Sequence, residues 1–406
     1  MMSEQRLRIG FLSALDPKDK RAWSGTFYYT SQALQQHCGE VIYINPKEEQ
    51  PSEKKAFYKK LRVFVKKKFA FSPLFSIGRK YFVCNYRIFT AKRFAKSANR
   101  RLRELPLDII VAAASTSEIA FVETDIPIVL IEDATFAVLH DYYPQYTNLP
   151  RSIAREMNNL SATAINKAEI LIYSSTWAAQ SAIEDYGAKR EKVHVVPMGA
   201  NIDAAPAPER ILSKKDSNRC RLLFIGFDWQ RKGGDIAFET LLKLEEMGIP
   251  TELIVCGCVP PSSYRHPHMR IIPFLDKNDP AQNQELEQLY LSSHFLLLPT
   301  RNDCFGIVFC EANAFGLPVI ATATGGTPEV VKNGENGFLL PFAARGDAYA
   351  KIIEELFHDE QRYDKLVQSS RAAYDNRLNW DAWGISVSSY ISEIVKREVQ
   401  KERLIS

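Results

Sequence analysis

Short apolar runs alternate along the first half of this chain with longer segments of helical periodicity. The apolar runs cover residues 7–12, 41–44, 109–113, 128–131, 170–173 and 193–196. Such runs are typical of buried strands, and strands separated by helix-length segments indicate a parallel sheet covered by helices. The pattern predicts an α/β domain with a doubly wound sheet.

The same pattern starts again after a charged stretch rich in Ala and Pro, residues 203–219. New apolar runs follow at residues 221–225, 252–256, 269–272, 295–298, 318–321 and 337–340. We therefore expect two Rossmann-like doubly wound domains, residues 1–202 and 203–380, facing each other across a cleft. A last helical segment, 381–406, could pack across both. Because ligands of open parallel sheets bind beyond the carboxyl ends of the strands, we expect one shared site.

Composition narrows the class of protein. The chain has 406 residues, of which 46% are hydrophobic and 25% charged, values that exclude extensive disorder and a fibrous repeat. No apolar stretch approaches the roughly 18 to 20 residues that span a bilayer. The seven cysteines form no CxxC pair and no Cys/His cluster at zinc spacing. With a polar amino terminus, these features predict reduced thiols and a cytoplasmic protein.

The charge is very unevenly distributed. Residues 54–103 contain seventeen Lys or Arg and no Asp or Glu, so the rest of the chain carries 4 − 17 = −13. Apolar residues in the first part of this basic segment recur at helical spacing: Phe57, Leu61, Phe64, Val65 and Phe69. A basic amphipathic helix favours peripheral binding to the inner, anionic face of a membrane. The alternative is a stripe packed on the domain's own core beneath solvated lysines. We expect no nucleic-acid partner.

Neither domain carries the GxGxxG turn of dinucleotide-binding proteins. In the first domain Gly25 opens a helical run and either approaches a ligand or only makes a turn. In the second domain, a strand leads into Arg231 and Lys232, followed by Gly233 and Gly234. Cations at the end of a strand, beside glycines that allow close backbone approach, are what a diphosphate requires, although surface Arg-Lys pairs are also common.

The segment from Pro299 to Ala321 carries the strongest chemical signal. A strand ends at Pro299, a loop carries Asp303 and Gly306, and a helix is expected to begin near Ile307 with unpaired amides that attract phosphate. Asp303 and Glu311 are eight positions apart, so along a helix they could be separated by as much as ~12 Å. That exceeds the spacing of a glycosidase pair and suits two carboxylates that hold hydroxyls at opposite ends of one ligand.

This segment resembles the E-x7-E region of the retaining GT-B glycosyltransferases of family GT4. Two further segments are similar to signatures of that family. One is the domain entry formed by Tyr173 to Ser175 and Val195 to Asp203, and the other is Gly325 to Glu329 with Asn336 to Leu339. The likeness covers nearly all of the second domain and is weak in the first.

The resemblance implies a hexosyltransferase that moves a sugar from a nucleotide-diphosphate donor to a hydroxyl, with retention at the anomeric carbon. The acceptor would be a saccharide or a lipid-linked precursor of a cell-envelope polysaccharide. By the same analogy Lys232 contacts the donor diphosphate and the amides of Gly306, Ile307 and Val308 hold its phosphates. Glu311 takes the ribose hydroxyls and Asp303 holds the donor sugar.

The sequence departs from the family pattern at two positions. Asp303 stands where the family usually has Glu, and Phe227 stands where it usually has Arg. Arg231 is the expected substitute for that missing charge. In the first domain, either Asp133 or His140 is the expected polar group facing the transferred sugar.

The sequence shows no DxD-like pair beside these cations, so we expect metal-independent transfer without a bound cofactor. Two other functions fit the same architecture. A nucleotide-sugar epimerase would convert the donor without an acceptor. A non-catalytic, membrane-associated protein would bind the donor and leave it unchanged.

Overall fold

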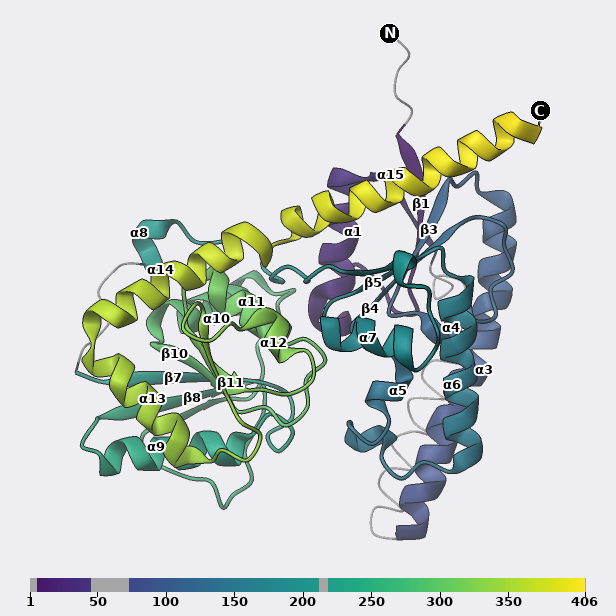
Figure 1. Ribbon diagram of the computed structural model, residues 1–406. Coiled ribbons are helices and arrows are strands. Elements are labelled where there is room, and N and C mark those ends of the chain that lie inside the picture. Colours follow the sequence, from purple (N-terminus) through teal and green to yellow (C-terminus); the bar gives the residue numbers. More distant parts are fainter. Residues whose placement is uncertain (1–5, 45–72, 212–217, 406) are drawn as a thin grey trace. The chain divides into compact units, whose positions relative to one another are not determined.

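The computed structural model describes residues 6–44, 73–211 and 218–405, and gives the backbone alone for 73–87, 398, 399 and 401–405. The chain forms two compact units. Unit 1 comprises the described residues of Met1–Lys18, Thr30–Val196 and Gly384–Ser406, and unit 2 comprises Asp19–Tyr29 and the described residues of Pro197–Trp383. Each unit contains one six-stranded parallel sheet (Figure 1).

The sheet of unit 1 has the strand order β2-β1-β3-β4-β5-β6. Its strands are β1 (Leu7–Leu12), β2 (Gly39–Ile44), β3 (Ile109–Ala113), β4 (Ile128–Glu132), β5 (Ile170–Tyr173) and β6 (Val193–Val195). The helices of this part are α1 (Thr26–His37), α3 (Pro73–Glu104), α4 (Thr116–Ile119), α5 (Phe136–Leu139), α6 (Arg151–Lys167) and α7 (Thr176–Glu184).

The sheet of unit 2 has the order β12-β11-β10-β7-β8-β9. Its strands are β7 (Cys220–Ile225), β8 (Thr251–Cys256), β9 (Met269–Ile272), β10 (Phe295–Leu298), β11 (Val319–Thr322) and β12 (Gly337–Leu340). Its helices are α8 (Pro208–Ile211), α9 (Gly234–Glu246), α10 (Pro280–Ser292), α11 (Ile307–Ala314), α12 (Thr327–Val330), α13 (Gly346–His358) and α14 (Glu360–Arg377). The twelve predicted strands are confirmed, with ends displaced by no more than two residues.

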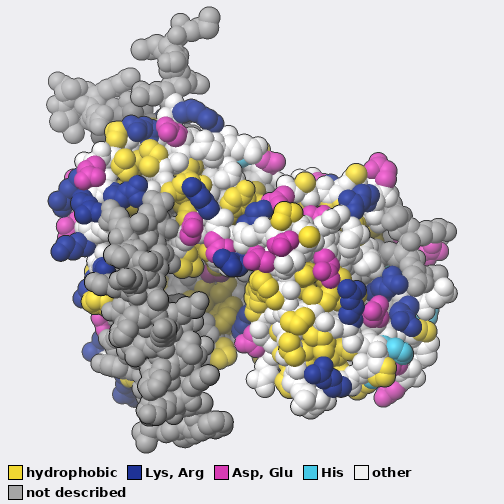
Figure 2. Space-filling view, turned by 180° about the vertical axis from the view of Figure 1, so that it is seen from behind, with side chains coloured by type: hydrophobic (Ala, Val, Ile, Leu, Met, Phe, Trp, Pro, Cys, Tyr) yellow, Lys and Arg dark blue, Asp and Glu magenta, His cyan; other side chains and the backbone are white. Residues whose placement is uncertain are grey.

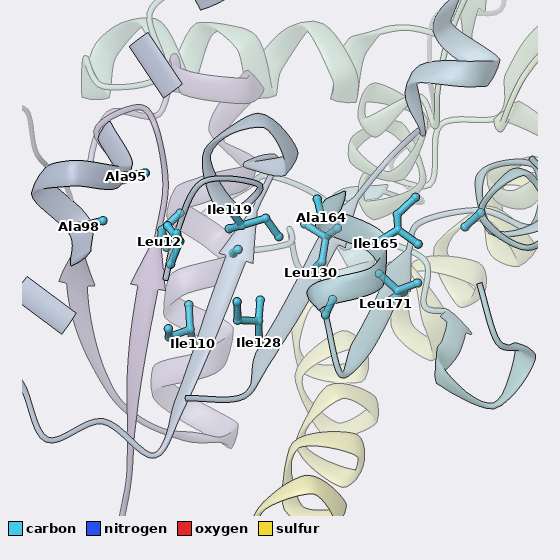
Figure 3. Packing of buried hydrophobic residues seen from close by; sticks show 14 of the residues in the cluster. Leu12, Ala95, Ala98, Ile110, Ile119, Ile128, Leu130, Ala164, Ile165 and Leu171 are labelled. Atoms are coloured by element: carbon cyan, nitrogen blue, oxygen red, sulfur yellow. The ribbon is translucent and has the colours of Figure 1, made fainter. Parts of the chain in front are cut away.

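The core of unit 1 shows why the apolar runs form central strands. Side chains of β1, β3, β4 and β5 point toward α3, α4 and α6, as Figure 3 shows for Leu12, Ile110, Leu130 and Leu171. Small residues such as Ala95 and Ala98 on α3 let the helix backbone lie close to this layer. Because both faces of the sheet are buried, these strands consist of continuous apolar residues and do not alternate apolar with polar positions.

The described side chains of α3 separate into an apolar and a basic face. Ile88, Ala91, Phe94, Ala95, Ala98 and Leu102 are buried in unit 1. Over residues 88–103, the apolar stripe therefore packs on the unit's own core, which is the alternative left open by the sequence. The predicted stripe from Phe57 to Phe69 lies outside the described residues. Figure 2 shows Lys and Arg side chains along the outer edge of unit 1, where α3 lies.

The chain passes from unit 1 to unit 2 between Val196 and Pro197, a few residues before the boundary expected at 202. The last helix, α15 (Trp380–Ile405), begins in unit 2, and its residues from Gly384 onward belong to unit 1. Among the described residues, no helix is both long and apolar enough to span a membrane.

Candidate active site

Two neighbouring strands of unit 2 bring Lys232 and Asp303 together. Lys232 lies between β7 and α9, and Asp303 lies between β10 and α11; the two strands pair directly in the sheet. Lys232 Nζ donates to Asp303 Oδ2 at 2.5 Å, and the two residues are only 9% and 8% exposed. Burial lowers the pKa of Lys232, while the carboxylate of Asp303 opposes that shift. The site thus has a buried cation balanced by one acid.

The predicted partner cation, Arg231, joins the same two loops. Its guanidinium Nη1 donates to the carbonyl of Asn302 at 2.8 Å, and its own carbonyl accepts from the amide of Arg301 at 2.8 Å. Residue 231 therefore fixes the loop that carries Asp303.

The glycines beside Lys232 make room for protein rather than leaving open space. A Cβ at Gly233 would lie 1.9 Å from the carbonyl oxygen of Pro299, and the φ of Gly233 is +74°. A Cβ at Gly226 would lie 2.8 Å from Lys232 Cγ. Gly233 needs glycine because the Lys232 turn packs closely against the end of β10, whereas Gly226 leaves space for the side chain of Lys232.

Helix α11 begins at Ile307, as the sequence predicts. Gly306 precedes it with φ +90° and provides no side-chain cap, so nothing on that residue covers the first amides, those of Ile307 and Val308. The amide of Gly326, from the second family signature, donates to the carbonyl of Asp303 at 3.2 Å. The motif segments that are separate in the sequence therefore converge on one loop at the start of α11.

Glu311, on the same helix, is engaged at both carboxylate oxygens. Oε1 accepts from Lys277 Nζ at 2.5 Å, and Oε2 accepts from the hydroxyl of Tyr290 at 2.8 Å. Burial, with the charge of Glu311, raises the pKa of Tyr290 well above its usual value, so the phenol stays a donor. The sequence analysis missed both partners, since neither lies in a recognisable motif. With these two partners the carboxylate retains further lone pairs that can accept hydrogen bonds from a ligand.

Lys277 also links Glu311 to the Gly25 turn through Asn201, all within unit 2. Lys277 Nζ donates to the carbonyl of Asn201 at 3.1 Å. The side-chain amide of Asn201 donates to the carbonyl of Ser24 at 2.9 Å and to Thr26 Oγ1 at 3.0 Å. Asn201 therefore connects the turn at Gly25 to the pair formed by Lys277 and Glu311.

The backbone of this turn is strained. Trp23 and Ser24 have φ angles of +49° and +58°, and Gly25 follows at +94°. Non-glycine residues in this region cost of order 1 to 3 kcal/mol each and tend to occur at functional sites. Whether Gly25 approaches a ligand or only makes a turn stays a prediction.

Asp133 and His140 belong to unit 1. Asp133 directly follows β4 and is half-buried; His140 follows α5, packs on the ring of Phe136 and lies 3.5 Å from the carboxylate of Asp141. The proposed role of either residue toward the sugar stays a prediction. Both lie on the carboxyl side of the sheet of unit 1.

Their neighbour Glu132 is a titratable group that the sequence analysis overlooked. It is 8% exposed, and its Oε1 accepts from the hydroxyl of Thr116 at 2.5 Å and from the amide of Thr116 at 3.1 Å. Burial raises its pKa to about 8, although these hydrogen bonds act in the opposite direction. The sequence signal that could have identified Glu132 is its position at the end of an apolar run that forms a buried strand.

Family models of known proteins match both halves of the chain. The profile described as "Glycosyltransferase Family 4" matches residues 26–204, and the profile described as "Glycosyl transferases group 1" matches residues 209–373. The chain belongs to the GT4-type glycosyltransferases. This confirms the family inferred from the Asp303 to Glu311 segment.

Individual relatives of this glycosyltransferase agree with that assignment. A D-inositol 3-phosphate glycosyltransferase of Corynebacterium aurimucosum is 25% identical over 296 residues, covering 68% of each chain. Further relatives of the same name align over about half to two thirds of their own length. These names favour a transferase over the epimerase and the non-catalytic binding protein.

Two solved structures show the shared fold. Sucrose-phosphate synthase of Thermosynechococcus elongatus has a TM-score of 0.69 at 16% identity, covering 97% of this chain and 100% of its own. HepE of Anabaena, in complex with UDP-glucose, has a TM-score of 0.56 at 18% identity, covering 97% and 100%. The glycosyltransferase fold expected from the sequence is confirmed. The individual site roles and the absence of a catalytic metal remain predictions.

Proposed function

We propose that this glycosyltransferase moves a hexosyl group from a nucleotide-diphosphate sugar to a hydroxyl acceptor, with retention at the anomeric carbon and without a catalytic metal. The observation that carries the proposal is the buried Lys232 beside the loop that opens α11. A buried ammonium and unpaired helix amides are suited to a diphosphate.

The chemistry requires charge neutralisation on the departing diphosphate. Lys232 and the amides of Gly306, Ile307 and Val308 supply fixed positive potential, and Arg231 holds the loop in place. The acceptor hydroxyl attacks the anomeric carbon on the face from which the diphosphate leaves, and a departing phosphate oxygen takes the hydroxyl proton. The bond from the anomeric carbon to the phosphate oxygen breaks as the new glycosidic bond forms.

Asp303 has two roles in this proposal. Without donor it balances the charge of Lys232, which keeps the ammonium buried at its working position. With donor present, the diphosphate shares that ammonium, and the Asp303 carboxylate accepts hydrogen bonds from the sugar hydroxyls. Glu311 accepts from the ribose hydroxyls with the lone pairs that Lys277 and Tyr290 do not occupy.

The donor and acceptor are proposed by class. The complex of HepE with UDP-glucose supports a uridine diphosphate sugar as the first donor to test. The name of the Corynebacterium relative, together with the basic α3, supports an acceptor that carries phosphate, either a sugar phosphate or a lipid-linked saccharide.

The decisive experiment is a thermal-shift screen of sugar nucleotides followed by a transfer assay. A true donor raises the melting temperature as its concentration rises. NMR of the product then reads the anomeric configuration, and an EDTA arm tests metal independence. Lys232→Ala and Glu311→Ala should lower transfer by orders of magnitude, whereas the exposed Lys351→Ala should not. Inverted product or wild-type transfer by Lys232→Ala would overturn the proposal.

The partner of the basic face of α3 is proposed to be an anionic membrane surface. A depression of about 650 Å³ is lined by Lys92, Lys96, Arg100, Arg103, Ala95, Asn99, Glu104, Phe121 and Glu123. Lys92 Nζ lies 5.3 Å from the centre of the Phe121 ring, so an aromatic group stands among the cations. The protein would then be a cytoplasmic one, attached peripherally to the inner face of the membrane.

Vesicle co-sedimentation tests this attachment. We expect binding to anionic but not neutral vesicles, weakening as salt rises. Replacing Lys92, Lys96 and Arg100 together by Glu should abolish binding. A control with the same change in charge replaces the exposed Arg265, Lys351 and Lys365 of unit 2, and should still bind. Equal loss in both triple variants would show that only net charge matters and would contradict a specific surface on α3.

A further inference from the structure

Two histidines and a glutamate of unit 2 meet at the end of α9. Glu245 lies on the last turns of α9, and His266 and His268 lie in the connection from β8 to β9. One potential ligand atom from each residue lies within 4.8 Å of the others. His266 Nε2 is 3.2 Å from Glu245 Oε2, and His268 Nδ1 contacts Glu245 Oε1.

The backbone holds the two histidines in place. The carbonyl of His268 accepts from the amide of Leu253 on β8 at 2.9 Å, and the amide of Met269 donates to the carbonyl of His266 at 3.1 Å. Pro267 between them restricts the turn. The imidazoles therefore project from a short segment fixed to the sheet, as a preformed ligand pair requires.

The cluster is accessible from solvent. The side chains of His266 and Glu245 are 20% and 24% exposed, and that of His268 is 44% exposed. A metal can therefore enter, and water can complete its coordination. Tetrahedral ligands on ~2.1 Å bonds lie about 3.4 Å apart, and the ligand atoms here all lie within 4.8 Å of one another, so binding needs only small side-chain adjustments.

We propose that Glu245, His266 and His268 form a binding site for a divalent transition metal such as Zn²⁺. Two imidazoles and a carboxylate are a ligand set that Zn²⁺ accepts, with water in the fourth position. Coordination through His266 Nε2 transfers the ring proton to Nδ1. It therefore gives up the long 3.3 Å contact between that atom and the amide of His268.

The position of the site implies a structural effect rather than a catalytic one. His268 immediately precedes β9, at the amino-terminal edge of the sheet, whereas Lys232, Lys277 and Asp303 follow the carboxyl ends of their strands. A metal here would join α9 to the β8 to β9 connection. The bound metal should stabilise the fold without taking part in sugar transfer. This site is therefore compatible with the proposal that transfer needs no catalytic metal.

The test uses the full chain without a histidine tag, dialysed against EDTA and titrated with Zn²⁺ by calorimetry. We expect one equivalent to bind and the melting temperature to rise. His268→Ala and Glu245→Gln should weaken binding by about tenfold or more. His358→Ala, which removes another exposed histidine of unit 2, should bind as the wild type does. Melting curves in EDTA establish that each variant is folded.

Co²⁺ identifies the ligand type independently. A cobalt spectrum without a thiolate charge-transfer band supports the nitrogen and oxygen site. A strong thiolate band would assign the metal to cysteine and overturn the proposal. Unchanged Zn²⁺ affinity in both His268→Ala and Glu245→Gln would also overturn it, as would no detectable Zn²⁺ binding by the wild type.

Discussion

The pairing of Lys232 with Asp303 allows stability and catalysis to be tested separately. Lys232→Met removes the charge but keeps most of the length of the side chain. It leaves the carboxylate of Asp303, which is 8% exposed, without its cation. Breaking a buried pair from one side typically costs about 3 to 5 kcal/mol. We expect the free energy of unfolding to fall by an amount of this order.

The partner substitution should be milder, and the double substitution should recover stability. In Asp303→Asn the remaining lysine can release its proton, because burial already lowers the pKa of Lys232. In Lys232→Met/Asp303→Asn neither member of the pair carries a charge, so most of the loss seen in Lys232→Met should be regained. A double-mutant cycle measures this coupling directly.

Activity should not recover with stability. Losing one fixed positive group at the diphosphate costs about 2 to 4 kcal/mol of transition-state stabilisation, or roughly 30- to 1,000-fold in rate. The assays are urea unfolding and kcat/KM for transfer from the donor found in the screen, with the exposed Lys351→Met as control. Transfer by the double variant at the wild-type rate, or additive stability effects, would refute the reasoning.

Three further predictions test separate features. Lys277→Met leaves the buried Glu311 without its cation, so KM for the donor, measured by donor titration, should rise at least tenfold. Adding Glu311→Gln to that variant removes the unpaired charge and should restore folding. Glu132 stays protonated in the folded protein up to its pKa of about 8, whereas in the unfolded chain it ionises above its ordinary value of 4.5. Raising the pH from 5 toward 8 should therefore lower the free energy of unfolding by at most about 1.4 kcal/mol per pH unit, and Glu132→Gln should remove this slope in pH-dependent melting. At Gly306 φ is +90° and a Cβ would lie 2.5 Å from the ring of Phe309, so Gly306→Ala should weaken donor binding tenfold or more; unchanged affinity would contradict a role for the start of α11.

The sequence determined the features that depend on neighbouring residues. Burial of both sheet faces requires continuous apolar runs, so all twelve strands could be identified, and the helix after Gly306 begins at Ile307 as expected. The motif from Asp303 to Glu311 identified the family because its residues are consecutive and their order is fixed.

Tertiary structure alone decided which distant groups meet. Lys277 and Tyr290 reach Glu311 from a loop and a helix outside any motif, and Glu245 meets His266 across 21 positions of sequence because β8 and β9 pair in parallel. It also decided that the apolar side of α3, over its described side chains, packs on the core. The spacing of apolar residues specifies where a strand runs and which face of a helix is buried. Strand order and register decide which side chains meet across the sheet, and both depend on the whole folded sheet.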